Sequence, residues 1–164
     1  MPYSAKAIAN AFIDIAQERG EKLTQMKLQK LVYVAHGWNL ALLDSPLIED
    51  TIEAWQYGPV IPTLYNEFRG YGRADINDRA TDVVIRDNSF EIEYVSPEVP
   101  LNDQQTRMLI QTVWDKYGHL SGPNLSDLTH RPGTPWSETF QNGIYHLPID
   151  NMLIRNHFQK LMSR

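Results

Sequence analysis

Apolar residues recur at helical spacing along the first quarter of the chain. A first helix is predicted to begin after Ser4, a good N-cap residue, and to stop at Gly20. Its buried stripe would comprise Ala5, Ile8, Ala9, Phe12, Ile13 and Ala16. A second helix is predicted from an N-cap at Thr24 to about Leu43. One of its faces carries Leu28, Leu31, Val32, Ala35 and Leu42, and the far side carries Val34, Trp38 and Ala41. A helix that is apolar almost all round is normally central and buried.

The middle of the chain changes to short alternating segments. Residues 52–57 alternate and include two aromatic residues, which predicts a strand that ends at a Gly58-Pro59 turn. Pro62 suits the first turn of a third helix that ends near Gly70. Residues 82–86 and 90–95 are predicted to form a hairpin, separated by 87–89. The second strand of this hairpin would turn one face toward the core, with Phe90, Ile92 and Tyr94.

Helical spacing returns in the last third of the chain. Asn102 and Gln105 are spaced as a capping box for a long helix that stops at Gly118. Its buried face would carry Leu109, Ile110, Val113, Trp114 and Tyr117. A short helix is predicted around 123–130, a brief turn at Pro135-Trp136, and a final helix capped by Asp150 with Ile154, Phe158 and Leu161 inward. The sequence therefore predicts a mainly α fold of six to seven helices with a small antiparallel β element, as a single compact α+β domain over residues 1–164.

Composition narrows the class of protein. Hydrophobic residues make up 42% and charged residues 21% of the 164, which is ordinary for a globular domain. The chain contains no cysteine, shows no membrane-spanning apolar run and opens without a signal-like segment, so we expect a cytoplasmic protein with no membrane partner. A net charge of −5 leaves little attraction for phosphate backbones, so nucleic-acid binding by this chain alone is disfavoured.

Motifs of catalysis and of metal binding are not found. The five histidines, at positions 36, 119, 130, 146 and 157, lack the spacing that places two ligands on one helix face. There is no nucleophile elbow, no thiol and no glycine-rich phosphate loop. We therefore expect no metal, no cofactor and no enzymatic activity. The alternative that this protein is a small hydrolase would require that the isolated protein is active. It would also require that substitution of one histidine or aspartate abolishes this activity.

Gln29, Tyr33 and His36 form a polar stripe on the otherwise apolar second helix. Because burying unpaired polar groups costs free energy, the stripe must be hydrogen-bonded inside the fold or exposed. One interpretation is an internal network that holds helices together. The other is the floor of a groove that faces a partner.

Two further clusters carry large aromatic residues. Trp55 and Tyr57 precede the Gly58-Pro59 pair, and residues of their type dominate protein interfaces when exposed. They serve equally well as anchors of a strand in the core. Near the C-terminus, Thr129 and His130 precede Trp136. One interpretation is a local lock, in which Thr129 or His130 hydrogen-bonds to neighbouring backbone groups and Trp136 packs beneath them. The alternative is that these residues recognise a partner.

The same three clusters resemble the blocks of a known family. The segment 24–33, Thr-Gln-Met-Lys-Leu-Gln-Lys-Leu-Val-Tyr, is similar to a Met-Lys-Leu-Gln-Lys-Leu-x-Tyr signature. The segment 53–60 resembles an Ala-Trp-x-x-Gly-Pro-Val block, and 125–130 with Pro135-Trp136 resembles a Leu-x-x-Leu-Thr-His block followed by Pro-Trp. The matching positions are Lys27, Leu28, Gln29, Leu31, Gly58, Pro59, Thr129 and His130. This is the Panacea, or SocA/GepA-like, antitoxin-domain family, and the resemblance covers most of the chain.

The resemblance implies an antitoxin of a bacterial or phage toxin–antitoxin system. Its partner would be a cognate protein toxin that it neutralises by direct binding. In one branch of the family the antitoxin instead acts as an adaptor that delivers the toxin to a cytosolic protease. The candidate anchors for a toxin are Tyr33, His36, Trp55, Tyr57 and Trp136. They come from the second helix, the strand after it and the late loop, which together would form one groove with a polar floor and aromatic walls.

Overall fold

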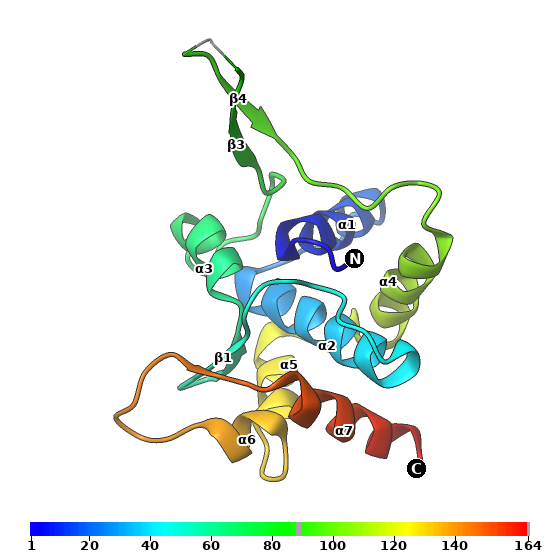
Figure 1. Ribbon diagram of the computed structural model, residues 1–164, viewed down its shortest axis with the longest axis vertical. Helices are drawn as coiled ribbons and strands as arrows, with labels where there is room; N and C mark the ends of the chain where they lie inside the picture. The colour runs from blue at the N-terminus through cyan, green and yellow to red at the C-terminus, as the bar shows by residue number, and fades with distance from the viewer. Residues whose placement is uncertain (88–89, 164) are drawn as a thin grey trace.

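The computed structural model describes residues 1–87 and 90–163, and within them the chain forms seven α-helices and two small antiparallel sheets (Figure 1). The helices are α1 (Ala5–Glu18), α2 (Gln25–Leu43), α3 (Pro62–Phe68), α4 (Gln104–Tyr117), α5 (Gly122–Thr129), α6 (Pro135–Thr139) and α7 (Asn151–Met162), with a 3-10 turn at Arg69–Tyr71. The strands are β1 (Glu53–Trp55), β2 (Gly58–Val60), β3 (Asp82–Ile85), β4 (Ile92–Val95) and β5 (Leu147–Pro148). The predicted mainly helical α+β fold is confirmed.

Helix α2 runs through the centre of the molecule and packs against α1, α3, α4, α5 and α7 (Figure 1). Leu28, Leu31 and Ala35 on one side and Val34 on the other are all buried, as the apolar pattern predicts. Leu42 was predicted to be buried and is instead 56% exposed. It lies in the last turn, just before Asp44 ends the helix in a left-handed conformation. The prediction for Leu42 failed because helical spacing gives a face but does not say how far along that face the neighbouring helices extend.

The contact between α2 and α7 centres on one aromatic ring. Phe158 of α7 lies edge-on to Tyr33 and to Trp38, with centroid separations of 6.1 and 5.2 Å. Its ring covers Gly37 so closely that a Cβ at that position would lie 2.2 Å from Cε2 of the ring. The absence of a side chain at Gly37 therefore sets how closely α7 approaches α2. Ile154 and Phe158 are buried, as predicted for the last helix, and Leu161 is partly buried.

Side-chain caps begin the helices close to where the sequence predicts. The hydroxyls of Ser4 and Thr24 accept from the backbone N–H groups of Ala7 and Lys27, each three residues later. The carboxylate of Asp150 caps α7 by accepting from the N–H of Met152, two residues later. The predicted cap of α4 at Asn102 is wrong by one residue, because the carboxylate of Asp103 accepts from Thr106 instead. Both residue types make good caps, so composition alone does not distinguish neighbouring candidates.

A three-stranded sheet in the order β2-β1-β5 flanks the N-terminal half of α2. Trp55 pairs with Gly58, so the tight turn is formed by Gln56 and Tyr57. The turn predicted at Gly58-Pro59 is therefore wrong, since these two residues begin the returning strand. Gly58 has a φ of 115°, which disfavours other residues, and Pro59 lies in an edge strand where a missing N–H is tolerated.

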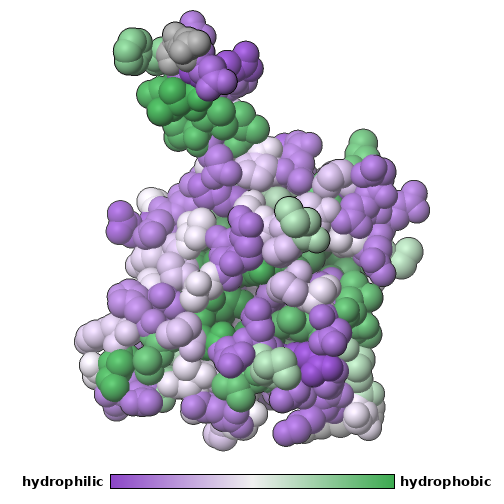
Figure 2. Space-filling view, in the orientation of Figure 1, coloured by the Kyte–Doolittle hydropathy of each residue, from purple (hydrophilic) through white to green (hydrophobic). Residues whose placement is uncertain are grey.

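The hairpin of β3 and β4 projects away from the helices (Figure 1). The predicted core face of its second strand is wrong: Phe90 is fully exposed, and Ile92 and Tyr94 are 60% and 69% exposed. Figure 2 shows a hydrophobic patch on the part of the projection nearest the body of the molecule, with hydrophilic residues beyond it. Alternation identified residues that share a face, but this hairpin has no described element against that face. Asn88 and Ser89, predicted to connect its strands, lie outside the described residues.

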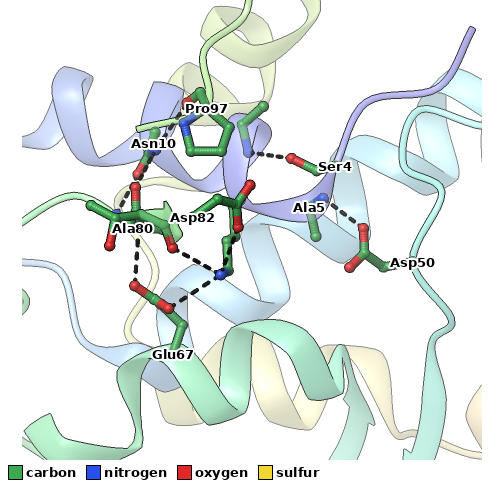
Figure 3. A network of polar contacts seen from close by, with 11 residues as sticks. Ser4, Ala5, Asn10, Asp50, Glu67, Ala80, Asp82 and Pro97 are labelled. Atoms are coloured by element: carbon green, nitrogen blue, oxygen red, sulfur yellow. Dashed lines mark hydrogen bonds and ion pairs between the residues drawn. The ribbon is translucent and has the colours of Figure 1, made fainter. Parts of the chain in front are cut away.

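Polar contacts with α1 hold the base of this hairpin (Figure 3). The ammonium of Lys6 donates to the Thr81 carbonyl and to the Asp82 carboxylate at 2.9 Å, and also pairs with Glu67 of α3. The amide of Asn10 donates to the carbonyls of Ala80 and Pro97 and accepts from the Ala80 N–H. The two ends of the projecting segment are thus fixed on the helical body.

Candidate functional site

A groove of about 1000 Å³ opens where the N-terminal half of α2, the β1–β2 hairpin, α3 and the loop 140–146 meet. The second helix and the strand after it, which the sequence predicted to take part in one groove, both line it, whereas the late segment around Trp136, the third predicted piece, does not; loop 140–146 lines it instead. Gln29 and Lys30 of α2 supply its polar floor. Its aromatic walls contain Trp55, Tyr57, Tyr65, Phe140 and Tyr145.

Gln29 fixes the start of α3 to the floor of the groove. Its side-chain amide donates to the Ile61 carbonyl at 3.0 Å and accepts from the Ile61 N–H at 2.8 Å. Gln29 is 4% exposed, and both of these contacts are buried. Because Gln29 satisfies both polar groups of one peptide unit, its role here is structural.

Lys30 lies beneath the hairpin turn and lines the same floor. Its ammonium donates to the Pro59 carbonyl at 2.7 Å, and the residue is only 3% exposed. Within residues 1–87 and 90–163, no carboxylate lies within ion-pair distance of it. Burial lowers the pKa of Lys30 to about 7. A Cβ at Gly58 would lie 3.0 Å from this ammonium, so the family-like Gly58-Pro59 pair leaves the space that Lys30 occupies.

Trp55 and Tyr57 form one wall of the groove. The Trp55 ring lies edge-on to Tyr65 and His146, with centroid separations of 4.9 and 5.7 Å. Its indole N–H donates to the Glu53 carboxylate at 2.9 Å. Tyr57 is 66% exposed, while its backbone carbonyl accepts from the Ser126 hydroxyl at 2.7 Å. The ring of Tyr57 is therefore presented to solvent from a turn that α5 holds in place.

Loop 140–146 forms another wall of the groove. Trp136 connects this loop to the wall that contains Trp55. The Trp136 indole N–H donates to the Trp55 carbonyl, and its ring stacks on Phe140 with centroids 4.7 Å apart. His130 packs edge-on to the other side of Trp136. Trp136 is partly buried and does not line the groove; it lies behind Phe140, which does. Tyr145 is 82% exposed at the rim.

Tyr33 and His36 lie farther along α2, in the core rather than in the groove. The Nδ1 of His36 accepts from the N–H groups of Leu47 and Ile48, and its Nε2 lies 2.9 Å from the Asn151 side-chain oxygen, to which it donates in this tautomer. Burial lowers the pKa of His36, which favours the neutral ring. Burial raises the pKa of the Tyr33 hydroxyl, which finds no partner within the described residues. These two candidate anchors do not reach the surface in this structure.

The remaining motif residues support the scaffold. Lys27 donates to the Gly118 carbonyl and lies over the Trp114 ring, 5.3 Å from its centroid. Leu28 and Leu31 are core residues. Thr129 donates to the carbonyls of Leu125 and Ser126, and the His130 ring contacts the same Ser126 carbonyl. This arrangement matches the local lock that the sequence suggested around Trp136.

Several residues of the groove were not predicted from the sequence, among them Lys30, Tyr65, Arg73, Phe140, Tyr145 and His146. The sequence does contain a signal for Lys30. A lysine in a helix that is apolar almost all round must either be buried or cover apolar surface with its side chain. The exposed Tyr145 lies in an irregular loop without periodicity, so its position depends on the tertiary fold alone.

The described residues contain no group of three or more histidine or carboxylate side chains placed to hold a metal ion. No helix in the described part of the chain is long and apolar enough to cross a bilayer. The groove, with its exposed aromatic rings, is therefore the best-formed candidate site in residues 1–87 and 90–163.

Comparisons with known proteins agree with the sequence resemblance. Residues 28–137, from α2 to the start of α6, match the family described as Antitoxin SocA-like, Panacea domain. Antitoxin SocA of Caulobacter vibrioides (strain NA1000 / CB15N) is 34% identical over 139 residues, which span 85% of this chain and 71% of that protein. No solved structure matches the chain. The chain belongs to the SocA-like Panacea antitoxin domain family.

Proposed function

We propose that this protein is the antitoxin of a toxin–antitoxin pair and neutralises its cognate protein toxin by direct binding in the groove beside α2. The proposal is supported by membership of the SocA-like family and by one structural observation above all. Tyr57 and Tyr145 leave most of their rings exposed at the mouth of an apolar groove. Exposed aromatic residues around a concave apolar surface are typical of protein-binding sites.

The walls of this groove are held before any partner arrives. The Trp55 carbonyl accepts from Trp136, and the Tyr57 carbonyl accepts from Ser126, so both aromatic residues extend from a fixed backbone. A surface that is already ordered loses less conformational entropy on binding, which increases affinity. A bound toxin would be held inactive because the complex covers its active site or prevents a conformational change.

Replacement of Tyr57 or Tyr145 by alanine tests the proposal. Because both rings are exposed, the melting temperature should change little, while affinity for the toxin should fall by about 2 kcal/mol or more if the rings are anchors. The product of the neighbouring open reading frame is used as the test toxin, and binding is measured by calorimetry with rescue of growth in parallel. Tyr94→Ala is the matched control, since Tyr94 is 69% exposed but lies on the projecting hairpin.

The control also identifies the alternative surface. If Tyr94→Ala weakens toxin binding and both groove variants bind normally, the interface lies on the β3–β4 hairpin and the groove proposal is wrong. If all three variants fold and neutralise the toxin normally, neither aromatic surface serves as its anchor.

Delivery of the toxin to a protease is the second candidate function. An adaptor needs one surface for its cargo and another for the protease, and the apolar hairpin is separate from the groove residues. Toxin stability in cells distinguishes the two mechanisms. Under simple inhibition the toxin accumulates in the complex, whereas under delivery its half-life falls when the antitoxin is co-expressed.

A further inference from the structure

The charge of the groove is opposite to that of the whole chain. The protein has 20 acidic and 15 basic residues, yet no aspartate or glutamate is among the described residues that line the groove. The ionisable side chains that line it and carry or can gain positive charge are Lys30, Arg73 and His146. The basic side chains that line the groove would thus attract an acidic group of a partner, and no lining carboxylate would repel it.

Lys30 is the unusual member of this set because it is buried. Within residues 1–87 and 90–163 its ammonium donates a single hydrogen bond, to the Pro59 carbonyl, whereas an ammonium group has three N–H donors. Buried charged groups in proteins are generally paired, since desolvation of an isolated charge is costly. The described part of the structure thus holds a buried amino group at the floor of an apolar groove, with no carboxylate within ion-pair distance.

The neighbouring titratable groups already have other partners. Glu53 lies beside the groove wall, but its carboxylate accepts from the Trp55 indole and pairs with His146 at 2.9 Å. His130 borders Gly58 from the end of α5 and contacts the Ser126 carbonyl. Arg73 is exposed at the rim. None of these groups supplies a negative charge to Lys30.

We propose that the groove recognises an aspartate or glutamate of the toxin, flanked by apolar or aromatic residues, and that Lys30 donates a hydrogen bond to this carboxylate. This inference rests on the proposed function and adds the chemistry of the recognised segment. The apolar flanks would contact Trp55, Tyr57 and Tyr145, while the carboxylate would occupy the floor. Charge-assisted hydrogen bonds of this kind strengthen and become more selective where water is excluded.

Lys30→Met tests the role of the ammonium, because methionine keeps the length of the side chain but removes its charge. Toxin affinity should fall about thirtyfold or more, the loss expected when one partner of a buried charge pair is removed. Lys27→Met is the matched control: Lys27 is also a buried lysine of α2, but it donates to Gly118 and does not line the groove. Its substitution should leave toxin affinity unchanged when the variant is assayed below its melting temperature.

Proton uptake gives a readout that a structural role of Lys30 would not change. With a pKa of about 7, Lys30 is mostly neutral at pH 8 in the free protein, and a bound carboxylate would hold it protonated. Calorimetry in buffers of different ionisation enthalpy should therefore record uptake of about one proton per complex at pH 8. This uptake should be absent in Lys30→Met and retained in Lys27→Met and in His146→Gln.

Substitutions in the toxin test the same contact with this protein left intact. Each surface aspartate or glutamate of the toxin is changed to its amide, and one such change should reproduce the affinity loss. That change should have little further effect on Lys30→Met, because the two substitutions remove one interaction.

The outcomes separate the inference from the proposed function. If the toxin binds wild-type protein but neither Lys30→Met nor any toxin carboxylate change weakens it, the acidic-recognition inference is overturned and direct binding stands. The inference is likewise overturned if Lys30→Met weakens binding while every carboxylate variant binds normally. If the toxin does not bind wild-type protein at all, the proposed function and the inference both fail.

Discussion

At the scale of single residues, four buried polar side chains of α2 each hold the backbone of a different part of the chain. The backbone groups that they bond lie outside α2: Lys27 bonds Gly118, Gln29 bonds Ile61, Lys30 bonds Pro59, and His36 bonds Leu47 and Ile48. Buried backbone groups that lie outside helices and strands need such partners. The central helix therefore positions the groove walls as well as the core.

The buried Lys30 predicts how stability depends on pH. Its pKa is about 7 in the folded protein and about 10.4 in an unfolded chain. Between these values the unfolded chain binds more protons, so the free energy of unfolding should rise as the pH increases from 7 to 9.5. Lys30→Met should reduce this rise, measured by urea unfolding at several pH values.

Two other groups complete this expectation. Burial also lowers the pKa of Lys27, so part of the rise should persist in Lys30→Met and should decline further when Lys27→Met is combined with it. Burial raises the pKa of Tyr33, so this residue acts above pH 10 and in the opposite direction. Equal slopes in wild type and Lys30→Met between pH 7 and 9.5 would show that Lys30 is charged and satisfied in the folded protein.

The sequence predicted two of the segments that line the groove, α2 and the strand after it, and only some of the lining residues. Trp55 and Tyr57 do line it, because a short strand and its turn next to a central helix leave large aromatic residues at the edge of the core. Tyr33 and His36 share a helix stripe with Gln29, but they lie one and two turns farther along, where α7 covers them. The spacing of residues along a helix predicts which side of the helix they occupy. It does not predict where along the helix the neighbouring elements end.

At the scale of elements, the helices were predictable because their signals are local. A capping hydroxyl or carboxylate and an apolar stripe are both contained in the segment itself, as for Ser4 and Asp150. The orientation of the β3–β4 hairpin could not be predicted from its own residues. A strand shows the same alternation whether its apolar face packs on the core or faces solvent. Its exposure in the structure depends on where α1 and α3 hold its two ends.

The packing of α7 on α2 predicts an inverted effect of a glycine substitution. Glycine to alanine in an exposed helix normally stabilises by about 1 kcal/mol, because alanine has the higher helix propensity. Gly37→Ala should instead destabilise by about 1–3 kcal/mol, since the new Cβ would overlap the Phe158 ring. Thermal or urea unfolding measures the sign. Gly70→Ala, which meets open space, is the control and should not destabilise comparably.

The projecting hairpin should be dispensable for the fold. Asp82 and Val95 are paired across its base, so residues 83–94 can be replaced by an Asn-Gly turn. The removed side chains are mostly exposed and the anchoring contacts of Lys6 and Asn10 remain, so the melting temperature should change by no more than a few degrees. A large fall in the melting temperature would contradict this independence.

At the scale of the whole molecule, α2 is enclosed by segments from both ends of the chain. α1 precedes it in sequence, whereas α4, α5 and α7 come from far downstream. Local sequence signals predict each of these helices, but they do not predict which of them surround α2, because that depends on contacts between distant residues. The groove shares this origin, since its two walls come from residues 54–57 and 140–146.

Removal of α7 should therefore abolish the cooperative fold. A chain that stops at Asp150 loses Ile154 and Phe158 from the core and exposes the part of α2 that they cover. Loss of one large core side chain already costs about 3–5 kcal/mol, comparable with the total stability of a small domain. Circular dichroism should show no sigmoidal thermal transition. The hairpin excision removes a segment of similar length and provides the comparison.

The enclosure of α2 has a consequence for synthesis of the protein on the ribosome. α2 is translated early, but the surface around Gly37 remains uncovered until Phe158 has emerged. During that interval the nascent chain carries an apolar helix without its last neighbour, which is the kind of surface that chaperones bind and that aggregates. Any chain interrupted before α7 would lack the core that holds both walls of the groove. A formed groove would then be present only in chains that have been translated through α7.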